Sequence, residues 1–235
     1  MGEMLPEGET TARAIYDALA SMAWYGETDL EEARGKRTAD MLTIALRSDA
    51  MSVCEENTEQ VCAALADMSA LCVRPHDKET FWFEVSIPRV FPEGDAPERL
   101  SISVDETPRK IYADEQLPDW LVAALKAVKE ERDELRFEDF VPNYDQITKL
   151  ADVYAAVKML SNSTGAVFEF TKPDPPRNMH GGIHLTVRGR FHLEADNLAA
   201  LISAIKTAGS LSVSSTEDGY VYLSFWVNNI YVDKK

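Results

Sequence analysis

Three histidines in the second half of the chain lie close enough in sequence to raise the question of a metal site. His180 and His184 are four residues apart, but two glycines lie between them, so helical ligand geometry is not expected. On the hairpin that we expect here, His184 and His192 would lie on the outer face of neighbouring strands, with Glu194 opposite His184. No carboxylate or cysteine with ligand spacing completes the set. We therefore expect neither a metal site nor a cofactor.

A loop rich in proline and glycine, residues 172–182, carries two polar candidates, Arg177 and His180. Loops of this kind can bind ligands, so an enzyme or a small-molecule-binding protein that uses this loop is one alternative. The chain contains neither a glycine-rich phosphate-binding motif nor a G-x-S-x-G nucleophile motif. Its acidic residues are so numerous that pairing two of them as a catalytic dyad would be arbitrary. We expect a protein that is not an enzyme and has no catalytic residues.

Aromatic side chains alternate with the apolar core row near the C-terminus and form the strongest candidate for a binding surface. Tyr220, Tyr222 and Trp226 would lie on the outer face of a strand, and Trp82 is the counterpart of Tyr222 in the first half. Aromatic residues on the face opposite the core need an explanation. One explanation is that a helix, the other half or a second subunit covers them. The other is a groove that binds an apolar segment of a partner.

The element that must carry this row belongs to a pattern that occurs twice in the chain. In the second copy, period-2 alternation at 183–187 and 191–193 predicts two strands. Gly189 is available for a positive φ in a three-residue turn, which would pair Val187 with Phe191 and Leu185 with Leu193. A helix follows, capped by Asp196 or Asn197 and ended by Gly209, and then two more strands.

The first copy has the same order of elements. From Met51 onward it aligns with the second copy at a constant offset of 140 residues, although few residues are identical. Asn57 and Gln60 have the spacing of a capping box. A helix precedes each copy, and in the second copy a strand at 166–171 follows that helix. The matching segment 27–34 of the first copy is too polar to assign. Agreement in order, register and loop length favours a duplication over chance similarity.

These patterns predict an α+β protein with two tandem, similar domains. Each domain would be an antiparallel sheet with helices packed on one face, in the order α-β-β-β-α-β-β. We place the first repeat at 1–91, an acidic connector at 92–140 with a helix near 118–135, and the second repeat at 141–235. The two copies could form an internal pseudo-dimer within a monomer, or the chain could form a homodimer.

Composition restricts the location and the partners. The chain has a net charge of −16, and acidic and basic residues balance within 141–235, so the excess negative charge lies in 1–140. A solvated surface would explain this charge, as would a docking face for a basic protein partner or an inhibitor that acts as an acidic decoy. Nucleic-acid binding is not expected without a basic stripe. No signal peptide or membrane-spanning run is evident, so we expect a cytoplasmic protein.

The order of elements in each copy resembles the type III secretion chaperone-like fold and the bacterial sensory-transduction-regulator family that shares it. The resemblance is carried by the order, and notably by the segment from Gly209 to Phe225 that follows a helix. It implies a compact, acidic, cytoplasmic and non-enzymatic α+β protein of a kind that is often dimeric. The family's domain ends with a third helix, which 118–135 could supply for the first copy but nothing supplies for the second. A competing resemblance is to sliding clamps, although each half lacks one strand of the clamp pattern.

Overall fold

The computed structural model describes residues 4–28, 30–38, 40–92, 140–171, 182–229 and 231–233. The expected helix near 118–135 lies outside these ranges, as do Arg177 and His180. The described part contains helices and two antiparallel sheets of five strands each, which confirms the predicted α+β class.

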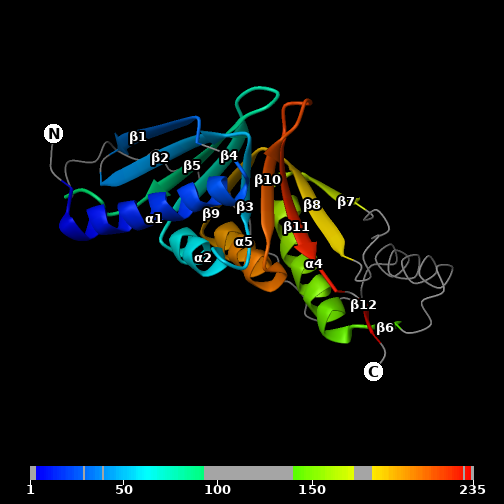
Figure 1. Cartoon of the computed structure of the whole chain (residues 1–235). Coiled ribbons are helices and arrows are strands. Elements are labelled where there is room, and N and C mark those ends of the chain that lie inside the picture. The colour runs from blue at the N-terminus through cyan, green and yellow to red at the C-terminus, as the bar shows by residue number, and fades with distance from the viewer. Residues whose placement is uncertain are drawn as a thin grey trace.

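Both halves contain the order of elements that the sequence predicts (Figure 1). The first half contains α1 (Pro6–Tyr25), β1 (Glu32–Thr38), β2 (Met41–Ser48), β3 (Ala50–Val53), α2 (Thr58–Ala66), β4 (Ala70–Pro75) and β5 (Phe81–Ile87). The second contains α4 (Tyr144–Thr164), β7 (Val167–Thr171), β8 (Ile183–Gly189), β9 (Phe191–Glu194), α5 (Ala195–Ala208), β10 (Leu211–Ser215) and β11 (Val221–Val227). Two short strands, β6 (Phe140–Pro142) and β12 (Tyr231–Asp233), pair with each other.

The two sheets exchange one strand. Sheet A has the order β1-β2-β5-β4-β9, so its fifth strand comes from the second half of the chain. Sheet B has the order β7-β8-β11-β10-β3, so its fifth strand comes from the first half. Corresponding strands occupy corresponding places, and β3 and β9 are the pair that cross over. The two halves are therefore related by an approximate internal twofold symmetry and complete each other's sheets.

The register of the exchanged strands obeys the same symmetry. In sheet A, Leu71 pairs with Leu193, and in sheet B, Leu211 pairs with Val53. Each residue of the second pair is the counterpart of one residue of the first at the offset of 140 residues that the sequence predicts. This agreement in three dimensions supports a duplicated origin of the two halves.

The expected hairpin in the second half is wrong, because β8 and β9 belong to different sheets. Only Arg190 separates these strands, and Phe191 pairs with Val73 rather than with Val187. A chain that bends sharply into a second sheet keeps the same inward alternation as a hairpin, so the apolar pattern alone does not distinguish them. Gly189 does not adopt a positive φ. A Cβ at this position would lie 2.7 Å from the Cβ of Ala166, so close packing explains the glycine.

The polar segment 27–34 that the sequence left unassigned leads into strand β1, which spans residues 32–38. It is an edge strand, paired with β2 on one side only. Ala33 and Gly35 pair with the buried Leu46 and Ile44 of β2 but remain exposed themselves. The corresponding inward positions of β7 are Phe168 and Phe170. An edge strand with small inward residues has no apolar alternation, which is why the period-2 pattern is missing.

The expected helix caps differ in detail from the observed ones. Helix α5 begins at Ala195 with Glu194 as its N-cap, rather than with Asp196 or Asn197, and Gly209 ends it at φ 70° as expected. Asn57 precedes α2 but makes no capping hydrogen bond. Its buried amide instead accepts from the Cys54 backbone N–H and donates to Ser21 Oγ and to the Ser52 carbonyl. It thereby ties α1 to the exchanged strand β3.

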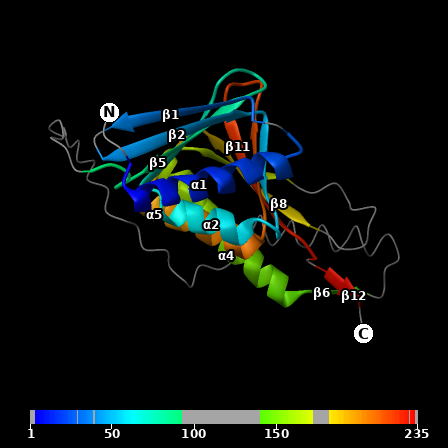
Figure 2. The same cartoon turned by 60° about the vertical axis from the view of Figure 1, so that its left-hand side comes forward.

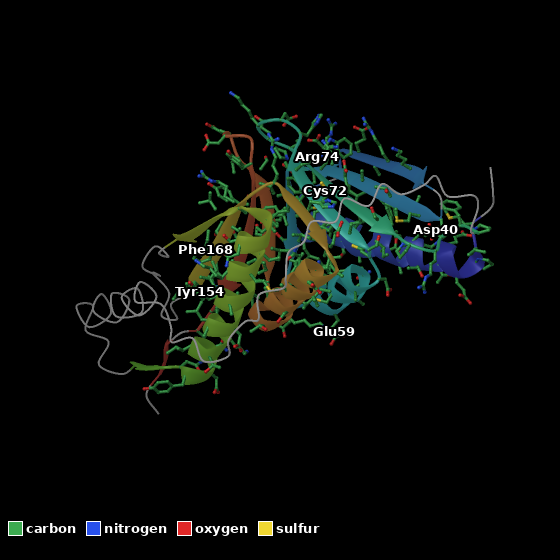
Figure 3. All side chains as sticks on the ribbon, turned by 180° about the vertical axis from the view of Figure 1, so that it is seen from behind. Asp40, Glu59, Cys72, Arg74, Tyr154 and Phe168 are labelled. Carbon is green, nitrogen blue, oxygen red and sulfur yellow. The ribbon has the colours of Figure 1, made fainter. Side chains whose placement is uncertain are left out.

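The four helices among the described residues lie together on one side of both sheets, in the order α1, α2, α5, α4 (Figure 1 and Figure 2). Helices α2 and α5, one from each half, meet in the middle of this layer. At one end of the layer, Tyr154 of α4 packs edge-on against Phe168 of β7, with ring centroids 5.5 Å apart (Figure 3). The buried residues of both halves form one continuous hydrophobic core. None of the helices among the described residues is long and apolar enough to cross a bilayer.

Candidate binding surface

The outer face of sheet B, opposite the helices, carries the aromatic row that the sequence singled out. Tyr222, Ser224 and Trp226 of β11 point outward and alternate with the buried core row. Tyr220 lies just before this strand. The structure therefore places Tyr220, Tyr222 and Trp226 on one face, as predicted from the period-2 alternation.

The neighbouring strands add short hydroxyl side chains to the same face. Ser224 pairs with Thr186 of β8 on one side and with Ser212 of β10 on the other. The hydroxyls of Thr186 and Ser224 are 2.9 Å apart and hydrogen-bonded. Next along the row, Ser212 pairs with Ser52 of the exchanged strand β3. The centre of the face is therefore a low row of hydroxyl groups, with taller aromatic residues on either side.

Large apolar side chains are exposed at both ends of this face. At one end, Tyr220 is 43% exposed and Val167 of β7 is also exposed, while the Arg188 guanidinium lies 5.5 Å from the centre of the Tyr220 ring. At the other end, Trp226 is 37% exposed, and the His184 ring packs edge-on against it at 3.9 Å between centroids. Burial lowers the pKa of His184, which favours its neutral form.

The outer face of sheet A carries Trp82, the fourth residue of the predicted aromatic set, but Trp82 is only 4% exposed. Side chains of its own sheet cover it. The Arg34 guanidinium lies 4.8 Å from the centre of the indole ring and that of Arg47 lies 6.0 Å away. The His76 ring packs edge-on against the indole, whose Nε1 donates to His76 Nδ1 over 3.2 Å. Trp82 itself therefore offers little surface to a partner.

Carboxylates hold these arginines in place. Arg34 Nε lies 2.5 Å from a Glu32 carboxylate oxygen, and Arg47 Nε lies 3.1 Å from Glu31. On β4, Arg74 forms an ion pair with Glu84 of the adjacent strand β5 (Arg74 is labelled in Figure 3). The hydrogen bond from Arg34 lowers the pKa of Glu32. This network balances its own charge, so it covers Trp82 without attracting an anion.

The internal symmetry makes the two outer faces directly comparable. Trp82 corresponds to Tyr222, Arg74 to Ser214 and Glu84 to Ser224 at the offset of 140 residues. Arg74 and Glu84 of sheet A are thus replaced by serines in sheet B, whereas Arg47, which pairs with Trp82, corresponds to Arg188, which pairs with Tyr222. Trp82 is 4% exposed, and Tyr222 at the same place in sheet B is half-buried.

The predicted proximity of two histidines is wrong. His192 lies on β9, where it pairs with Cys72 in sheet A, whereas His184 lies on β8 in sheet B. Glu194 pairs with Ala70 rather than with His184. Among the residues that the structure describes, no group of three His, Cys, Asp or Glu side chains is arranged to hold a metal ion.

Two features of these faces were not predicted from the sequence. Val167 extends the open face of sheet B, and arginines on β1 and β2 cover Trp82. The sequence does contain a signal for the second, because Arg47, Trp82 and Arg74 fall at matching outward positions of three adjacent strands. Recognising it requires the strand order, which the local pattern does not provide.

No family model, no curated protein and no solved structure matches this chain.

Proposed function

We propose that this chain is a non-enzymatic, cytoplasmic protein that binds another protein through the outer face of sheet B, in a chaperone-like or regulatory role. One observation carries the proposal. Trp82 of sheet A is sealed by an ion-pair network, whereas its counterpart in sheet B, Tyr222, is only half-buried. In the same outer row, Tyr220 and Trp226 are exposed on either side of Tyr222. Two copies that share one fold differ at this place, which supports a specific role for the open face.

The side chains of the open face suit a protein partner. Tyrosine, tryptophan and arginine are the residue types that most often dominate the energy of protein interfaces, and Tyr220, Tyr222, Trp226 and Arg188 lie together here. Serine hydroxyls beside tyrosines provide adaptable hydrogen bonds, as in antibody paratopes. A face with a hydroxyl centre and an aromatic margin can therefore contact both apolar and polar groups of a partner.

Charge supports a partner that carries basic residues elsewhere on its surface. The excess negative charge lies within residues 1–140, whereas the open face lies mainly on strands of the neutral second half. Such a field accelerates the approach of a basic protein without contributing to the contact itself. The resemblance of each half to the type III secretion chaperone-like fold agrees with this role as an analogy of fold.

A capture experiment with face variants tests the proposal. The tagged wild-type chain and the double variant Tyr222→Ser/Trp226→Ser are incubated with native lysate, and retained proteins are quantified by mass spectrometry. Loss of two aromatic contacts costs on the order of 2 kcal/mol or more, so we expect at least about a tenfold loss of the specific partner.

The control is Tyr144→Ser, which removes an aromatic side chain that is 74% exposed at the start of α4, away from the face. This variant should retain the partner at the wild-type level. Equal capture by all three proteins would refute the proposal, as would retention of a small metabolite and no protein.

A further inference from the structure

The strand exchange between the halves has a consequence for association of the chain with itself. Strand β9 lies along β4 of the first half, and β3 lies along β10 of the second half. Each half therefore has one strand that it donates and one sheet edge that accepts the strand of the other half. The two contacts are equivalent in register and direction.

Neither half is complete by itself. The exchanged strands bury Met51, Val53, Phe191 and Leu193, and each of these side chains is at most 2% exposed. Burial of four large apolar side chains stabilises a fold by an amount comparable to the whole net stability of a typical domain. The halves are thus obligate partners of each other.

These contacts do not depend on whether the two halves belong to the same molecule. Residues 93–139 connect them, and a chain of that length can extend to a maximum of about 150 Å at about 3.3 Å per residue. We propose that the chain forms an exchanged dimer with a second copy, in which the first half of each molecule combines with the second half of the other. All contacts between halves are then kept, and only the path of the connector changes.

The balance between monomer and exchanged dimer follows from the connector. The covalent connection gives the tethered half an effective concentration on the order of millimolar, which the second copy must match in order to compete. The ratio of dimer to monomer should therefore rise with the concentration of free monomer, about 50-fold between about 10 µM and about 1 mM total protein. Conversion between folded monomer and exchanged dimer is slow, because both exchanged strands must leave the shared core.

The full chain tests this proposal without dissection. Equal amounts of unlabelled and ¹⁵N-labelled protein are unfolded together, refolded at about 10 µM and at about 1 mM, and separated by size-exclusion chromatography. The expected result is a dimer peak whose ratio to monomer rises about 50-fold with concentration and which contains mixed isotope pairs.

A cleavage step distinguishes strand exchange from ordinary surface association. A specific protease site is inserted within residues 93–139, and the isolated dimer is cut under native conditions. An exchanged dimer must fall to complexes with the mass of one chain, each holding one fragment from each parent molecule. The proposal is overturned if the cut dimer keeps its size, if dimer forms on mixing folded proteins, or if the dimer ratio does not change with refolding concentration.

Discussion

Replacement of Phe191 by alanine should destabilise both halves of the chain. Phe191 belongs to the second half by sequence, but it lies on β9, is 1% exposed and pairs with Val73 in sheet A. Its removal leaves a cavity in the sheet of the first half. Replacement of a buried phenylalanine by alanine lowers the free energy of unfolding by about 3–5 kcal/mol, a large part of the stability of a protein of this size.

Two tryptophans report on the two sheets separately. Trp82 lies in sheet A and Trp226 in sheet B, so variants in which one of these two is the sole tryptophan, with the other three of the chain replaced by phenylalanine, follow each sheet by fluorescence during denaturant unfolding. Phe191→Ala should lower the free energy of unfolding by about 3–5 kcal/mol at both probes, in a single transition. The symmetry-related change Met51→Ala should act in the same way, by about 2–5 kcal/mol.

The alternative is two domains that fold independently. In that case Phe191→Ala would shift the transition of the Trp226 probe and leave that of the Trp82 probe unchanged. Two separate transitions in the wild-type chain, one for each probe, would equally refute the strand-exchanged arrangement.

Three other predictions concern single sites. Gly189→Ala should lower the free energy of unfolding in thermal melts by about 1–3 kcal/mol, because the added Cβ would lie 2.7 Å from the Cβ of Ala166. Gly35→Ala, whose added Cβ would have its nearest neighbour at 3.9 Å, should change the free energy of unfolding by less than about 0.5 kcal/mol, and equal effects of the two changes would contradict the packing argument. Arg34→Gln should uncover Trp82 and increase its quenching by acrylamide, with a loss of about 0.5–1 kcal/mol, and unchanged quenching would show that the guanidinium does not shield the ring. Burial lowers the pKa of His184 in the folded state. As the pH falls below about 6.5, the imidazole is therefore protonated in the unfolded chain before it is protonated in the folded one. The free energy of unfolding should decrease over the pH range from about 6.5 down to the folded-state pKa. His184→Gln should remove that part of the pH dependence in denaturation curves collected from pH 8 to about pH 5, and an identical pH dependence in both proteins would contradict the assignment.

The sequence predicts the elements of this fold well where one face of an element is buried. The alternation through Leu223 and Phe225 and the helical spacing from Leu198 to Ile205 reflect a buried face, and both elements occur where expected. The edge strand β1 could not be predicted in this way, because its inward residues are small and exposed. Periodicity records burial, so a strand without a buried row leaves no trace in it.

The exchange of strands could not be predicted for a different reason. Phe191 and Leu193 point into the core whether β9 folds back on β8 or crosses to β4, and their burial is the same in both cases. A local pattern specifies which face is buried but not which strand lies alongside. The choice depends on the shared core of the two halves, which involves residues more than 100 positions apart in the chain.

The candidate surface was predicted in part. The outward direction of Tyr222 and Trp226 follows from alternation with the core row, and the structure places both on the open face of sheet B. The same argument applied to Trp82 gives the correct direction but not its burial, which depends on arginines of two adjacent strands. Direction is a local property, whereas exposure depends on neighbours across the sheet.

Site-specific photo-crosslinking at two symmetry-related positions tests the central claim most directly. A photoreactive amino acid is placed at Ser224, at the centre of the open face, or at Glu84, its counterpart on the closed face, and cells that express each variant are irradiated. The open-face position should form a covalent adduct with another protein, and the closed-face position should not. Adducts of equal yield at both positions, or none at Ser224, would contradict a binding role for the outer face of sheet B.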